Sequence, residues 1–253
     1  MHKIETPFYR SWPGASDFLA QALYPILSVA FVSTLLNLPM MPSLFLAQDQ
    51  LAAYSDSYWV LLCQFVSIIL SAWLTMFIWL GARNWFQRGS FWQQRVGENL
   101  EEALWATPGY LVFSMGFSFL LLLSFAALIF PALYVGPRFL FFPHLSALGL
   151  VEEGNGRLAF THDLSRGHYF ACLFFFVFFV LQEFYFAFLD RLVAHAPLGV
   201  VFLGLGAISF VGVFFEAWAC LFTCELLEPK EEVMAATGSD NSMQFQDGES
   251  SPE

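Results

Sequence analysis

Charge is what this sequence has least of. Only 12% of its 253 residues are charged, whereas 58% are hydrophobic and 19% are aromatic; soluble domains contain about 25% charged residues. So few charges could not cover a water-soluble domain of this size, so the composition predicts an integral membrane protein. Ten Lys and Arg against 21 Asp and Glu give a net charge of −11, and this shortage of cations argues against nucleic acid as a partner.

Motifs for catalysis and metal binding are also lacking. The sequence has no Gly-rich phosphate loop, no His-Glu-x-x-His pair and no Gly-x-Ser-x-Gly elbow. Its cysteines lie in apolar runs without metal-ligand spacing to a histidine, so we interpret all four as packing residues: Cys63, Cys172, Cys220 and Cys224. We therefore expect no enzymatic activity, no cofactor and no metal site.

Long apolar runs are what the sequence has in abundance. A helix needs about 20 apolar residues to cross the hydrocarbon core of a bilayer. The runs predict an all-α fold, a polytopic transmembrane helical bundle within residues 1–228. Its six predicted spans cover about 17–38, 57–81, 109–130, 132–150, 169–190 and 197–225.

The number of spans depends on the segment after Pro131. Cytoplasmic loops are enriched in Lys and Arg, and two connectors carry such residues: Arg83, Arg88 and Arg95 in one, Arg157 and Arg166 in the other. Two helices joined by a turn at Pro131 place both connectors on the cytoplasmic side, with both termini. The alternative has five spans, with Pro131 to Val151 as a kinked or re-entrant segment.

Two segments outside the spans have their own character. Residues 91–105 have apolar residues at four-residue spacing, with acids on other faces, which predicts an amphipathic helix. That helix either lies in the cytoplasmic interface or packs under the bundle. Residues 229–253 form a polar, acidic tail that we predict to be disordered, because it has too little apolar area to bury.

Four ionisable residues lie within predicted spans: Arg138, His144, Glu183 and Glu216. Each costs about 2.5–3.5 kcal/mol at the centre of a spanning helix, so each needs a reason to be there. Their depths suggest two pairs, Arg138 with Glu183 and His144 with Glu216. We favour the interpretation that these pairs orient the helices, and keep a polar cavity or proton-linked path as the functional alternative.

Two short stretches carry a resemblance. One runs from Pro131 through Tyr134 to Pro143, and the other contains Thr161, Leu164 and Gly167. This pattern resembles the YciC-like inner-membrane proteins and the similar membrane domain attached to some glycerophosphoryl diester phosphodiesterases, although Thr161 stands where Ser is usual. The resemblance implies a six-span bundle in the bacterial cell inner membrane, and it implies no established activity.

These observations lead to two hypotheses about function. The first is a multi-pass inner-membrane protein of structural, accessory or membrane-homeostasis type, without catalysis. The second is a small-solute or lipid transporter, or a lipid-handling protein, with a polar site near Arg138 and Glu183. In either case we expect a lipid bilayer around the chain and a membrane protein or a second copy as partner.

Overall fold

The computed structural model describes residues 7–37, 58–88, 96–127, 129–150, 156–193 and 198–243. Within these ranges the chain forms helices and no strand, so the prediction of an all-α fold is confirmed. The helices are α1 (Pro7–Gln21), α2 (Leu23–Asn37), α4 (Tyr58–Arg88), α5 (Val96–Ala127), α6 (Ile129–Phe139), α7 (Phe142–Ala147), α8 (Arg157–Ser165), α9 (Tyr169–Val193) and α10 (Leu198–Met243).

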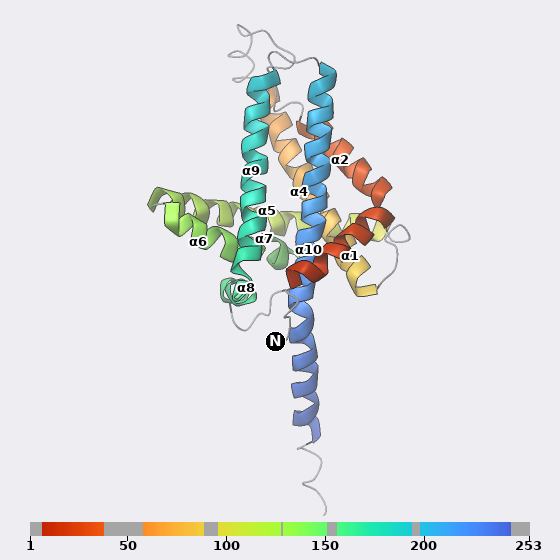
Figure 1. Ribbon diagram of the computed structural model, residues 1–253, viewed down its shortest axis with the longest axis vertical. Coiled ribbons are helices and arrows are strands. Elements are labelled where there is room, and N and C mark those ends of the chain that lie inside the picture. Colours follow the sequence, from red (N-terminus) through yellow and green to blue (C-terminus); the bar gives the residue numbers. More distant parts are fainter. Residues whose placement is uncertain are drawn as a thin grey trace, which may run out of the picture.

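Helix α10 is the central element of the fold. It contacts α1, α2, α4 and α9. In Figure 1, α9 and α10 run along the long axis of the molecule, whereas α5 and α6 run across it. Gly212 permits the close approach of α10 to α9, because a Cβ there would lie 3.1 Å from Cδ of Gln182. The last part of α10 extends beyond the other helices (Figure 1).

Three helices are long and apolar enough to cross a membrane. They are Leu61–Gln87 of α4, Val96–Ala126 of α5 and Gly199–Leu227 of α10. Two bent pairs could each serve as one span: α1 with α2, bent by 85°, and α8 with α9, bent by 106°. The described residues therefore contain three to five candidate spans, and the sixth span stays a prediction.

Large apolar side chains cover much of the outer surface. On α5, Trp105, Met115 and Phe119 are 79%, 73% and 62% exposed. Soluble monomers rarely show contiguous apolar surface on this scale. A bilayer would cover these side chains, so the structure agrees with a membrane-embedded protein.

Prolines divide two of the helices that we predicted as continuous. The helix predicted over 17–38 bends by 85° between α1 and α2, and Pro25 is the third residue of α2. The helix predicted over 132–150 is divided into α6 and α7, and Pro143 follows four residues after Phe139, the last residue of α6. In a continuous helix a proline ring clashes with the carbonyl four residues earlier, which explains both breaks.

The break predicted between residues 105 and 109 is absent. Helix α5 is continuous from Val96 through Pro108, so the predicted amphipathic helix and the third span form one element; residues 91–95 lie outside the described ranges. Its first part packs against the bundle, since Asn99 and Ala103 are buried. Leu104 and Trp105 are 61% and 79% exposed, so a place in the cytoplasmic interface stays a prediction for this segment.

The predicted start of the acidic tail also differs from the structure. Helix α10 continues to Met243, so residues 229–243 are helical rather than disordered, and residues 244–253 lie outside the described ranges. Residues 231–236, Glu-Glu-Val-Met-Ala-Ala, consist mainly of strong helix formers. Our prediction considered only the apolar area that this segment can bury. A segment that continues an already packed helix needs to bury little apolar area of its own.

Candidate functional site

A buried polar cluster joins α4, α7 and α10. Nε1 of Trp79 on α4 donates a hydrogen bond to Oε2 of Glu216 on α10, at 2.7 Å. Nε2 of His144 on α7 lies 3.7 Å from the same oxygen. We call these three residues, Trp79, His144 and Glu216, the Glu216 cluster.

Aromatic rings enclose the imidazole of His144. It stacks on the Trp79 indole, with ring centroids 4.0 Å apart and planes inclined by 17°. The ring of Tyr110 on α5 lies 4.9 Å away. Both nitrogens of His144 are buried and make no hydrogen bond, because 3.7 Å to Glu216 exceeds hydrogen-bond length. The cluster therefore rests on one strong hydrogen bond and on stacking.

Local sequence explains how these side chains are positioned. Trp79 lies in the stretch Met76–Leu80 of α4, in which every residue is buried. Glu216 and Cys220 are four residues apart and share one face of α10. Cys220 uses that face as well, since its Sγ donates to the carbonyl of Trp79 at 3.2 Å. One turn of α10 thus holds the Trp79 residue at both its side chain and its backbone.

The sequence predicted half of this site. It predicted that His144 and Glu216 meet, and the structure brings them together. It missed Trp79 and Tyr110, because an aromatic residue inside an apolar run has the same pattern whether it packs or donates. It also missed the contact between α4 and α5 in which Nδ2 of Asn84 donates to Oδ1 of Asn99 at 2.7 Å.

Arg138 lies elsewhere, beside the first turn of α9. Its guanidinium carbon is 5.3 Å from the ring centroid of Tyr134 and 5.7 Å from that of Tyr169. Glu183 follows Tyr169 on α9 by almost four turns, or about 21 Å at ~1.5 Å per residue, and its side chain lies outside the described part of the chain. The predicted pairing of Arg138 with Glu183 therefore lies outside the described residues and stays a prediction.

The residues that carried the family resemblance shape the corner formed by α6, α7 and α8. Thr161 is buried and its hydroxyl donates to the carbonyl of Arg157 at 3.0 Å, while Leu164 belongs to the core. Gly167 has φ +96°, a conformation that favours glycine, in the turn before α9. Pro131 lies in the first turn of α6 and Pro143 in that of α7, where a missing N–H costs no helical hydrogen bond.

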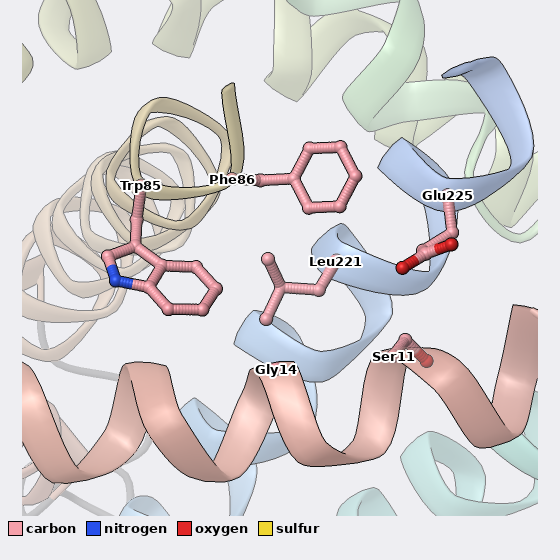
Figure 2. Close-up of a pocket in the computed structure, with 6 residues that line it drawn as sticks. All are labelled: Ser11, Gly14, Trp85, Phe86, Leu221 and Glu225. Atoms are coloured by element: carbon pink, nitrogen blue, oxygen red, sulfur yellow. The ribbon is translucent and has the colours of Figure 1, made fainter. Parts of the chain in front are cut away.

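A pocket of about 290 Å³ opens between α1, α4 and α10 (Figure 2). Figure 2 shows the rings of Trp85 and Phe86 on one side, with Ser11 and Glu225 lying near each other on another. Ser11 already accepts a hydrogen bond from Nε1 of Trp218, at 3.0 Å. The pocket is lined by Ser11, Gly14, Trp85, Phe86, Leu221 and Glu225, so it does not include the Glu216 cluster.

Metal ligands and relatives give no further assignment. Within the described ranges, no group of three or more His, Cys, Asp or Glu side chains could hold a metal ion. No family model, no curated protein and no solved structure matches this chain.

Proposed function

We propose that this chain is a non-catalytic, multi-pass membrane protein of structural, accessory or membrane-homeostasis type in the bacterial inner membrane. The Glu216 cluster supports the proposal. The carboxyl group of Glu216 accepts a hydrogen bond from Trp79 and lies against His144, so the cluster joins three helices. Two other polar side-chain contacts also join helices. Asn84 with Asn99 joins α4 to α5, and Trp218 with Ser11 joins α10 to α1.

Purification in a mild detergent tests this function. A structural or accessory protein is expected to retain a stoichiometric protein partner, or a second copy of itself, through affinity purification and size exclusion. Cross-linking in membranes before extraction should capture the same partner. A chain that purifies as a monomer and sustains solute or lipid flux in liposomes by itself would contradict the proposal.

Transport or lipid handling is the second candidate function. It is favoured by Arg138, whose Nε and Nη1 are buried without a hydrogen-bond partner. It predicts that Arg138→Gln abolishes a flux in proteoliposomes while the protein stays folded. Loss of folding without any flux in the parent protein would leave only the structural role.

We further propose six spans with both termini in the cytoplasm. The two groups of arginines support this arrangement, because it places both on the cytoplasmic side. One contact favours the five-span alternative instead: Tyr169, at the start of α9, donates to the carbonyl of Leu133 and so brings the residues after Pro131 to the same side as α8. Single cysteines introduced at Asp49 or His195 should be labelled by a membrane-impermeant reagent in intact cells, and cysteines at Arg95, Asn155 or Asp240 should be labelled only after permeabilisation. Each variant is made with Cys63 replaced, since Cys63 is exposed. Labelling of position 155 in intact cells would give five spans, with α6 and α7 re-entrant.

A further inference from the structure

The guanidinium of Arg138 lacks the acceptor that a buried cation needs. Its Nε and Nη1 are buried without a hydrogen-bond partner. Arginine stays protonated in proteins and offers five N–H donors. A buried, charged donor without an acceptor is among the costliest features of a folded protein, so a site of this kind needs an acceptor from a bound group.

Two tyrosine rings contact this guanidinium, and of its three nitrogens only Nε and Nη1 are buried without a partner, so Nη2 is the nitrogen that a ligand reaches first. The rings of Tyr134 and Tyr169 lie within 6 Å, the range of cation–π contact. Contact through the π-face leaves the N–H donors in the guanidinium plane, where they match two oxygens of a phosphate or carboxylate. An oxyanion is therefore the ligand that suits the remaining donors.

The rings are themselves held in place. The hydroxyl of Tyr169 donates to the carbonyl of Leu133 at 2.8 Å. The hydroxyl of Tyr134 lies 3.3 Å from Nε2 of His162 on α8. Three helices, α6, α8 and α9, thus contribute to the surroundings of Arg138, and the arrangement does not depend on one flexible side chain.

We propose that Arg138 binds the phosphate of a phospholipid at the junction of α6, α8 and α9. Apolar surface beside the arginine identifies a lipid as the source of that phosphate. Phe130, Tyr134 and Arg138 follow one another at four-residue spacing on one face of α6, and Phe130 is 82% exposed. Phe170, the neighbour of Tyr169, is also 82% exposed. An acyl chain that leaves the phosphate can lie along this face.

The charges around the junction favour an anionic headgroup. Arg157 and Arg166, at the two ends of α8, are exposed, and basic side chains near a membrane surface attract anionic lipids. Within the described ranges, His162 contacts the acid Asp163, whose Oδ1 lies 3.5 Å from Nδ1 of that histidine. Tyrosines are also enriched at the level of lipid headgroups.

Lipid binding to the full chain in detergent tests the proposal. The probes are dioleoyl phosphatidylglycerol, dioleoylglycerol, which has the same chains without phosphate, and inorganic phosphate. Native mass spectrometry of the parent protein should show one retained phosphatidylglycerol that the phosphate-free lipid does not displace. Arg138→Gln should weaken its binding at least tenfold. Arg138→Lys should weaken it severalfold, because an ammonium lacks the planar fork.

Arg166→Gln is the comparison for general charge attraction, since it removes the same charge from the exposed end of α8; it should weaken binding about two- to threefold, well below the loss in Arg138→Gln. Equal losses in Arg138→Gln and Arg166→Gln would mean general charge attraction and would overturn the site. Competition by dioleoylglycerol would assign the retained lipid to the apolar surface alone. Competition by millimolar inorganic phosphate with no lipid retained would make free phosphate the ligand, against the proposal.

The comparison of probes on the parent protein decides the question even if Arg138→Gln does not fold. The proposal does not rest on the structural or accessory role proposed above, and it deepens the second candidate, lipid handling at Arg138. Retention of this lipid requires no protein partner, and retention of a partner requires no lipid, so the two experiments fail separately.

Discussion

Trp79→Phe is expected to lower the free energy of unfolding by about 1–3 kcal/mol, the usual cost of leaving a buried polar group without its hydrogen-bond partner. The substitution removes the N–H that donates to Oε2 of Glu216 at 2.7 Å, and the carboxyl group then lacks this donor. It also removes part of the indole on which His144 stacks. Unfolding in mixed micelles with increasing denaturing detergent measures the loss.

Two further variants isolate the hydrogen bond from the change in size. Trp73→Phe makes the same substitution on the same helix, where the indole donates to the carbonyl of Leu100 at 3.1 Å; a single neutral hydrogen bond contributes about 0.5–1.5 kcal/mol. Glu216→Gln keeps an acceptor oxygen and should change stability less than Trp79→Phe. The double variant Trp79→Phe with Glu216→Gln should cost less than the sum of the single changes, because contacting residues are coupled. Strict additivity would show that the two side chains act separately.

Gly136→Ala is expected to destabilise the contact between α6 and α9 by about 1–3 kcal/mol, the usual cost of overpacking a core. A Cβ at Gly136 would lie 2.9 Å from Cδ2 of Phe176 and closer still to Cε2 and Cζ of that ring. Phe176 is 5% exposed, so its ring has little room to move. Thermal unfolding monitored by the loss of α6–α9 cross-linking measures the effect.

Gly116→Ala on α5 is the matched control. A Cβ there would meet nothing within 4 Å, so the variant should be neutral or more stable by up to about 1 kcal/mol through helix propensity alone. Equal responses at Gly136 and Gly116 would contradict the close approach of α6 to α9. Gly136→Ala with Phe176→Leu should recover part of the lost stability, since the smaller side chain makes room.

The prolines show where reading the sequence for apolar runs falls short. Length and hydropathy gave the approximate ranges of α4, α9 and α10, because an apolar run of span length has few other stable forms. They placed one helix over 132–150, where the structure has α6 and α7. Pro143 signals that break, and Pro25 signals the bend before α2. Pro108 carries the same local signal, yet α5 runs through it. A proline alone therefore does not tell a break from a tolerated kink, because neighbouring packing decides how much distortion a helix accepts.

For the charged residues too, the sequence predicted only part of the arrangement. Depth along a span predicted two pairs, His144 with Glu216 and Arg138 with Glu183. Depth fixes only the position along the membrane normal and leaves the position within the membrane plane open. Helix α7 turns His144 toward Glu216 at 3.7 Å. Helix α6 brings Arg138 to the beginning of α9, beside the rings of Tyr134 and Tyr169.

What the sequence determined by itself is the class of protein: an all-α, membrane-embedded chain, because so many apolar residues and so few charges leave a lipid environment as the stable one. The tertiary structure alone decided which polar side chains meet. Trp79 donates to Glu216 across α4 and α10, and Arg138 lies between two tyrosines, because helix crossing and the direction of each side chain set these contacts. The spacing of residues along one helix determines neither the angle at which helices cross nor the direction of each side chain.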